Sequence, residues 1–288
     1  MKAARAPRFK IGTKINRDLT VLGAIRTRGR YPVYIVWHHA DWAPMACKVF
    51  GVLNRAQREA DILAVLEHPN IVRLFGVAEP ALLLMEFLEG PTLETVVDEM
   101  PRERMSISNA IRVAIHLGAA LHHIHRKGFI HLDVKPLNVI VVHGRPILYD
   151  FGSARKQGAP RPSHVAGTDG YIAPEECLRG EVTPACDVFG LGVTLYEMLT
   201  GELPFPRKTA RQPFPQATAS PIPLRRRRNI PGALEELVMA TLAREPAQRP
   251  AIPALLPLLH DFIRSGPPII FELGQVPQVM NHFMHEDG

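Results

Sequence analysis

Four polar residues between positions 133 and 150 have the types and the spacing that metal-dependent phosphoryl transfer requires. Asp133 can accept the proton of an attacking hydroxyl, and the cation Lys135 follows two residues later. Asn138 and Asp150 offer the oxygen ligands that Mg²⁺ prefers, and a short apolar strand separates them. The segment therefore predicts a site that handles a hydroxyl, a phosphate chain and a divalent metal ion.

A lysine within an apolar strand gives a second chemical signal. Lys48 ends the run Met45-Ala46-Cys47-Lys48, and a buried ammonium group is costly unless an acid pairs with it. Glu59 lies eleven residues further on, in a segment with helical spacing. We therefore expect an ion pair between Lys48 and Glu59.

The elements that must position these residues follow from periodicity and turn residues. β-branched and aromatic residues from Leu19 to Phe50 predict antiparallel strands, and two further strands run to Glu86. Apolar residues at helical spacing predict helices at 56–66, 106–125, 233–243 and 251–263. Six prolines exclude regular helix from residues 202–230.

In these features the chain resembles the eukaryotic-like (Hanks-type) serine/threonine protein kinase family, in the style of its bacterial members. The resemblance covers residues 18–263, because the family's motifs follow one another there in the family's order. They are the strand motif ending at Lys48, the helix residue Glu59, His68-Pro69-Asn70, the hinge at 84–90, the catalytic loop at 131–138, Asp150-Phe151-Gly152, the docking loop at 167–175, Asp187 and Arg249.

The resemblance implies an α+β, bilobal protein kinase fold. A small antiparallel β-sheet with the helix known as helix C would form the N-lobe at 18–86, and a larger, mostly helical C-lobe would follow at 87–263. Residues 1–17 would be a basic lead-in and 264–288 a C-terminal extension. The length of 288 residues and the apolar content of 46% suit one such catalytic unit.

The resemblance also implies the roles of the site residues. Asp133 would accept the hydroxyl proton, Lys135 and Lys48 would contact phosphate, and Glu59 would hold Lys48. Asn138 and Asp150 would bind Mg²⁺, or Mn²⁺, beneath ATP. The nucleotide would further contact Val33, Ala46, Met85, Glu86, Leu88 and Ile140. Thr168 would contact Asp133 and Lys135, Arg249 would pair with Glu175, Phe151 would be a core residue, and Asp187 a buried acceptor that ties the catalytic loop to a helix.

Two departures from the family pattern concern the phosphate loop and the catalytic loop. The pattern G-x-G-x-x-G-x-V places a glycine where Tyr31 stands, and only Gly23 and Gly29 remain, out of register. A bulky residue should hold the loop away from phosphate, and Arg26, Arg28 or Arg30 could compensate through a side chain. Leu132 replaces the family's usual arginine, so we expect a non-RD enzyme that needs no activating phosphorylation.

The expected function is ATP- and Mg²⁺-dependent phosphorylation of Ser or Thr hydroxyls in a protein substrate, because Lys135 follows Asp133 by two residues as in serine/threonine kinases. A pseudokinase scaffold that binds nucleotide weakly would explain the altered glycine loop. A small-molecule kinase would share the catalytic acid and amide, but normally lacks counterparts of Asp150-Phe151-Gly152, Glu175 and Arg249.

Composition limits the other classes of function. Three cysteines without a C-x-x-C pair suggest neither disulfides nor zinc, and no apolar run reaches the length of a membrane span or signal-peptide core. We expect a cytoplasmic protein with neither a membrane nor a nucleic-acid partner. The net charge of +6 is dispersed apart from the run 225–228, which is interpreted as a solvated loop or as a docking segment for an acidic partner. His122, His123, His125 and His131 lack the acid or Cys that would complete a metal site.

Overall fold

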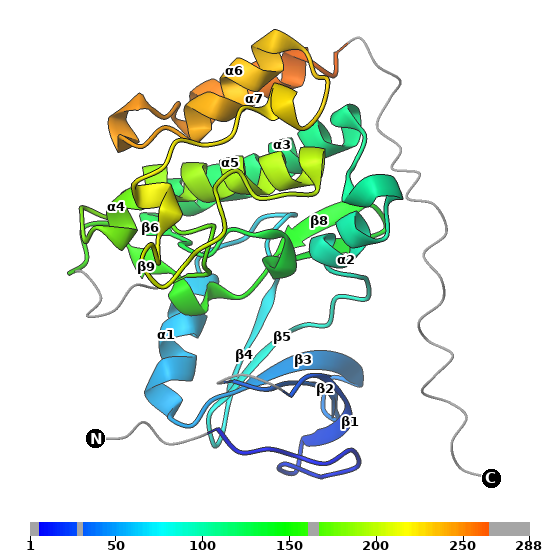
Figure 1. The fold of residues 1–288 in the computed structure, drawn as a ribbon. Coiled ribbons are helices and arrows are strands. Elements are labelled where there is room, and N and C mark those ends of the chain that lie inside the picture. Colours follow the sequence, from blue (N-terminus) through cyan, green and yellow to red (C-terminus); the bar gives the residue numbers. More distant parts are fainter. Residues whose placement is uncertain (1–5, 28–30, 161–166, 265–288) are drawn as a thin grey trace.

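The computed structural model describes residues 6–27, 31–160 and 167–264 and has two lobes (Figure 1). The smaller lobe contains a five-stranded antiparallel sheet with strand order β1-β2-β3-β5-β4. Its strands are β1 (Leu19–Arg26), β2 (Val33–His38), β3 (Ala43–Val49), β4 (Leu74–Ala78) and β5 (Leu82–Glu86). The predicted strands between Leu19 and Glu86 are therefore confirmed.

One helix of the smaller lobe, α1 (Leu53–Leu63), extends toward the larger lobe and carries Glu59. It buries Ala56, Ala60 and Leu63, which recur at the three- and four-residue spacing of one helical face. The sequence predicts this helix at 56–66, so the observed helix begins and ends three residues earlier. No side chain caps its N-terminus, which explains why capping signals did not locate its start.

The larger lobe consists mainly of helices around the long pair α3 (Ile107–Arg126) and α5 (Ala185–Thr200). Ser106 caps α3 by accepting a hydrogen bond from the Asn109 amide, and Gly128 follows its end with a φ of 81°, as the sequence predicts. The other helices are α2 (Leu93–Asp98), α4 (Pro174–Cys177), α6 (Gly232–Thr241) and α7 (Ile252–Asp261). The α+β bilobal prediction is confirmed, although the sequence did not indicate α2.

Short strands in the larger lobe position the loops that carry Asp133, Asn138 and Asp150. β7 (Val139–Val142) pairs with β8 (Arg145–Leu148), and β6 (Phe129–Ile130) pairs with β9 (Arg155–Lys156). The hairpin β7–β8 joins the 3₁₀ turn η2 (Pro136–Asn138) to the turn η3 (Phe151–Ser153). The hairpin therefore places the catalytic loop and the turn at Asp150 at the same edge of this lobe.

Two glycines allow α5 to lie close to its neighbours. A Cβ on Gly190 would lie 3.1 Å from the Val134 Cβ and 3.2 Å from the Val134 carbonyl oxygen. A Cβ on Gly192 would lie 2.1 Å from the Thr241 Oγ1, on α6. Helix α5 therefore lies close to the catalytic loop and to α6 at glycine positions; an alanine would clash at Gly192 and would force a small shift of Val134 at Gly190.

The proline-rich connection at 202–230 contains no α-helix, as predicted; its helical turns are η4 (Pro215–Ala217) and η5 (Leu224–Arg226), which are both 3₁₀. The arginine run in it differs from a purely solvated loop. Arg227 pairs with Glu202 at 2.6 Å, and Arg228 donates to the carbonyl oxygens of Met105 and Leu199. Part of the run therefore joins the connection to the ends of α3 and α5.

The basic lead-in is attached to the smaller lobe over its described residues. Ala6 is buried, and the Phe9 ring packs edge-on against Tyr34 with centroids 5.8 Å apart. The Phe9 amide also donates to the Tyr34 hydroxyl at 3.0 Å. Part of the lead-in thus covers an apolar cluster on the face of the sheet that carries Tyr34 and Cys47. Of the C-terminal extension predicted at 264–288, residues 265–288 lie outside the described residues.

Candidate active site

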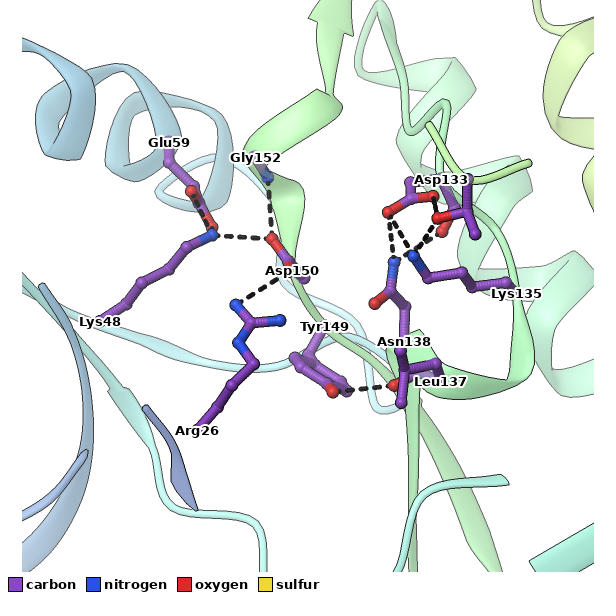
Figure 2. Close-up of polar contacts among 11 residues, drawn as sticks. Arg26, Lys48, Glu59, Asp133, Lys135, Leu137, Asn138, Tyr149, Asp150 and Gly152 are labelled. Carbon is purple, nitrogen blue, oxygen red and sulfur yellow. Dashed lines mark hydrogen bonds and ion pairs between the residues drawn. The ribbon is translucent and has the colours of Figure 1, made fainter. Parts of the chain in front are cut away.

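A lysine and two acids meet where the two lobes face each other (Figure 2). Lys48 Nζ donates to both carboxylate oxygens of Glu59 at 2.8 Å and to Asp150 Oδ1 at 2.7 Å. Only 3% of each of the Lys48 and Glu59 side chains is exposed. The predicted ion pair is therefore present, and it extends to a third residue from the other lobe.

Lys48 and the two acids favour one another's charged forms, whereas burial, together with repulsion from Asp150, raises the pKa of Glu59 despite the neighbouring Lys48. Burial alone would lower the pKa of Lys48, but Glu59 and Asp150 outweigh it and raise the pKa above its usual value. Burial would raise the pKa of Asp150, yet Lys48, with a contribution from Arg26, holds it well below its usual range. Lys48 is therefore a cation and Asp150 an anion at neutral pH.

The backbone around Asp150 explains how this carboxylate reaches Lys48. Asp150 has a φ of 64°, a conformation that Asp adopts more readily than most residues, and its side chain accepts from the Gly152 amide at 3.4 Å. A Cβ on Gly152 would lie 3.2 Å from Asp150 Oδ1 and 3.3 Å from Lys48 Nζ. Phe151 is buried with its ring 4.8 Å from that of His131, and so anchors the turn as the sequence predicts.

A second polar cluster forms on the catalytic loop and the docking loop. Asp133 Oδ2 accepts from Lys135 Nζ at 3.0 Å and from Asn138 Nδ2 at 2.8 Å. Thr168 Oγ1 donates to Asp133 Oδ1 at 2.8 Å and also accepts from Lys135 Nζ. The structure thus brings together Asp133, Lys135, Asn138 and Thr168, and it gives Thr168 both of its predicted contacts.

The donor set fits a divalent ion with a preference for oxygen. Asn138 Nδ2 makes two hydrogen bonds to Asp133, so the amide oxygen of Asn138 faces away from that acid (Figure 2). This oxygen and the Asp150 carboxylate are hard ligands of the type that Mg²⁺ and Mn²⁺ bind. No cluster of three or more His, Cys, Asp or Glu suited to a metal occurs within residues 6–27, 31–160 and 167–264.

A buried acid, Asp187, holds the backbone of the catalytic loop through hydrogen bonds. Asp187 accepts from the backbone amides of His131 at 2.9 Å and Leu132 at 2.8 Å, and its Oδ2 lies 2.8 Å from His125 Nε2. Asp187 lies in the first turn of α5 and is buried. The predicted role of Asp187 as a buried acceptor is confirmed, and His125 and His131 act as packing and hydrogen-bonding residues.

The residues expected around the nucleotide base lie on neighbouring strands. Val33 is on β2, Ala46 on β3, and Met85 and Glu86 on β5, with Ala46 directly opposite Met85 in the ladder. Leu88 follows β5 and is buried. Ile140 comes from β7 of the larger lobe and forms a bridge with Thr92. Both lobes therefore contribute apolar residues to the expected base site.

Tyr31 has a structural role that the sequence did not indicate. Its ring packs on Phe50 with centroids 4.6 Å apart, and its hydroxyl accepts a hydrogen bond from Arg55 of α1. The residue in the third glycine position thus ties the end of the loop to the helix that carries Glu59. Arg28, Gly29 and Arg30 lie outside the described residues.

Arg26 is a site residue whose position the sequence left open. One guanidinium nitrogen of Arg26 lies 3.5 Å from Asp150 Oδ2 (Figure 2). Counting back seven residues from Val33 places Arg26 at the first glycine of the pattern, and that count was the available signal. Among Arg26, Arg28 and Arg30, the structure describes only Arg26.

An ion pair remote from the chemistry fixes the end of the docking loop. Arg249 donates to both carboxylate oxygens of Glu175 at 2.7 Å, and its guanidinium also bonds the carbonyl oxygens of Ala185 and Ala243. Both partners are buried. The predicted pairing is present, and it connects the docking loop to the segment that follows α6.

Comparison with known proteins agrees with this geometry. A family model described as the protein kinase domain matches residues 32–263. Pkn2, a serine/threonine-protein kinase of Myxococcus xanthus, is 34% identical over 246 residues, covering 80% of this chain and 29% of that protein. PrkC of Bacillus subtilis, also a serine/threonine-protein kinase, is 30% identical over 260 residues, covering 83% and 39% respectively.

A third relative is serine/threonine-protein kinase PknA of Mycobacterium tuberculosis, which is 33% identical over 217 residues, covering 68% of this chain and 48% of that protein. The matched region thus spans less than half of each of these relatives. The chain belongs to the protein kinase family, and its resemblance to Hanks-type bacterial kinases is confirmed.

Proposed function

We propose that this chain is a serine/threonine protein kinase that transfers the γ-phosphoryl group of ATP to a Ser or Thr hydroxyl of a protein, with Mg²⁺ or Mn²⁺ bound at Asn138 and Asp150. The observation that carries the proposal is the presence of two polar clusters, one around Lys48 and one around Asp133. The triad around Lys48 supplies a cation and a metal ligand, and the cluster around Asp133 supplies a base with a cation beside it.

The chemistry follows from where charge develops. Transfer moves negative charge onto the bridging oxygen of the departing diphosphate, and fixed cations that are already in place lower the barrier. Lys48, held by Glu59, would bind the phosphates of the nucleotide. Bound Mg²⁺ would neutralise charge on the phosphate oxygens. Asp133 would orient the hydroxyl and accept its proton, while Lys135 would contact the phosphoryl group.

Thr168 supports assignment to a protein substrate. Its hydroxyl contacts both Asp133 and Lys135, so the docking loop and the catalytic base are coupled. The Glu175–Arg249 pair that fixes this loop argues against a small-molecule kinase, which normally lacks it. Leu132 makes the loop a non-RD type.

A cytoplasmic location is part of the proposal, and the three free cysteines fit a reducing compartment. Within residues 6–27, 31–160 and 167–264, no helix has the length and apolar character needed to cross a bilayer.

One assay distinguishes the candidates. The purified protein is incubated with labelled ATP and Mg²⁺, together with basic peptides that differ only in a Ser, Thr or Tyr acceptor, and separately with aminoglycoside and choline. We expect label on the Ser and Thr peptides alone. Label on a small molecule would support the small-molecule class. Nucleotide binding without any transfer would support a pseudokinase scaffold, which Tyr31 in the glycine pattern favours.

Matched variants assign that activity to the site. Lys48→Met and Asp150→Asn should each reduce transfer by about two to three orders of magnitude, the loss seen when one preorganised charge contact is removed. Lys14→Met makes the same substitution at an exposed lysine of the same lobe and should leave transfer unchanged. Near wild-type transfer in either site variant, with an unchanged circular-dichroism spectrum, would contradict the assignment.

A further inference from the structure

The carboxylate of Asp150 faces two cations rather than one. Lys48 lies 2.7 Å from Oδ1, and the Arg26 guanidinium lies 3.5 Å from Oδ2 (Figure 2). The Arg26 side chain is 40% exposed, in contrast to the buried lysine. Each oxygen of this carboxylate therefore has a cation of its own, and the more exposed cation is the one that can leave.

The strand register explains why Arg26 points at this carboxylate. Arg26 lies opposite Val33 on β2, and Val33 lies opposite Lys48 on β3. Residues directly opposite one another in a ladder project from the same face of the sheet. Arg26 and Lys48 therefore share the face that looks toward Asp150.

A bulge in β1 creates that register. The pairing passes from Ala24 opposite Tyr34 to Arg26 opposite Val33, so Ile25 is left out of the ladder and is 51% exposed. Without the extra residue, Ile25 would lie opposite Val33. Bulges next to active sites commonly re-aim a side chain, and here the side chain re-aimed is the arginine.

Charge balance decides what happens to Arg26 when Asp150 binds a metal. Glu59 and Asp150 carry two negative charges, and Lys48 and Arg26 carry two positive charges. A divalent cation bound at Asp150 would compete with the guanidinium for this carboxylate and would repel it. Phosphate oxygens provide a better partner, because a guanidinium can bind two of them at once in a planar arrangement.

We propose that Arg26 is a phosphate ligand for the nucleotide: it pairs with Asp150 until a metal ion binds that carboxylate, and it then binds phosphate oxygens. This inference rests on the proposed function. Arg26 occupies the first glycine position of the family pattern, where a glycine would let backbone amides approach the phosphates. In this chain, a side chain takes over that contact.

Calorimetric titration with three ligands tests the proposal. Adenosine, ADP and a non-hydrolysable ATP analogue, each with Mg²⁺, are titrated into wild type, Arg26→Ala, Arg26→Lys and Arg17→Ala. Arg26→Ala should bind ADP and the analogue about tenfold more weakly and bind adenosine as wild type does, since only phosphates lose a charge-assisted contact. Arg26→Lys, which keeps the charge without the fork, should fall between.

Arg17→Ala removes one positive charge from an exposed arginine of the same lobe and should match wild type with all three ligands. Equal binding by Arg26→Ala, or tighter binding of the analogue, would overturn the proposal, and tighter binding would identify Arg26 as a competitor of the metal. If wild type binds none of the phosphorylated ligands, the proposed function itself falls. Melting temperatures measured without ligand confirm that each variant is folded.

Discussion

The carboxylate of Asp187 accepts a hydrogen bond from the backbone amide of Leu132 at 2.8 Å. Leu132 is buried and has a φ of 65°, a conformation that bulky residues rarely adopt. A strained backbone of this kind persists when its surroundings over-determine it. The acid on α5 therefore holds the residue immediately before Asp133 in a shape that its own preferences disfavour.

Replacing Asp187 should release that constraint. In Asp187→Asn, the amide oxygen can still accept hydrogen bonds on one side, but on the other side the NH₂ faces a backbone N–H, which therefore loses its acceptor. We expect a loss of about 1.5–3 kcal/mol in the free energy of unfolding, the value of a hydrogen bond to a charged group, together with a lower kcat. Urea denaturation and steady-state kinetics measure the two effects. Asp61→Asn, at an exposed position on α1, is the matched control, and equal stability of both variants would refute the role given to Asp187.

Thr168→Ala should impair the chemical step and leave nucleotide affinity intact. Its hydroxyl joins Asp133 to Lys135, and a small displacement of a catalytic group can reduce the rate about a hundredfold. Steady-state kinetics should therefore show a kcat reduced by between ten- and a hundredfold with an unchanged KM for ATP. Thr168→Ser keeps the hydroxyl and should recover most of the rate. A change confined to the KM for ATP would place Thr168 in nucleotide binding instead.

Tyr31→Gly should tighten nucleotide binding by about 1 kcal/mol, comparable to one net hydrogen bond, because a glycine lets the loop approach the phosphates. Titration with a non-hydrolysable ATP analogue measures the change. Tyr31→Phe keeps the ring on Phe50 and removes only the hydroxyl that Arg55 contacts, so it should resemble wild type. Weaker binding in the glycine variant would mean that attachment to α1 matters more than close approach to phosphate.

Activity should survive dephosphorylation. Leu132 stands where an arginine would need a phosphorylated activation segment to balance its charge, so phosphatase-treated protein should transfer phosphate as fast as untreated protein. Ser163→Ala should likewise be neutral; Ser163 and Arg161 lie outside the described residues. A large loss after phosphatase treatment would mean that another cation, Arg155 or Arg161, balances a phosphorylated residue in place of the missing arginine; Arg155 lies near Arg58 and donates to the Pro160 carbonyl.

Much of this architecture can be predicted from the sequence because local patterns encode it. Ser106 and Gly128 delimit α3 through capping and a left-handed residue, and prolines exclude helix from 202–230. The contacts among Lys48, Glu59 and Asp150 were partly predictable, because a lysine in an apolar strand needs an acid. A buried lysine has few stable arrangements other than pairing with an acid, and this is why the ion pair was predictable from residue types.

The direction in which the Arg26 side chain points could not be predicted in the same way. Its direction depends on two bulges in β1, which leave Leu22 and Ile25 out of the ladder, and period-two alternation does not reveal which residues a bulge leaves out. The arginine run was ambiguous for a related reason. Arg227 and Arg228 find partners at Glu202, Leu199 and Met105, and spacing along the chain gives no information about contacts that depend on how helices pack.

The glycine contact between α5 and the catalytic loop has a mechanical consequence. Val134 lies between Asp133 and Lys135, and it rests on Gly190, which has no side chain. Side chains absorb small displacements by changing rotamer, whereas backbone in direct contact has no such freedom. We therefore expect a shift of α5 to displace Asp133 and Lys135 as well. The helix and the loop should then move together, and we expect motion that opens or closes the site to occur between them and the sheet that carries Lys48.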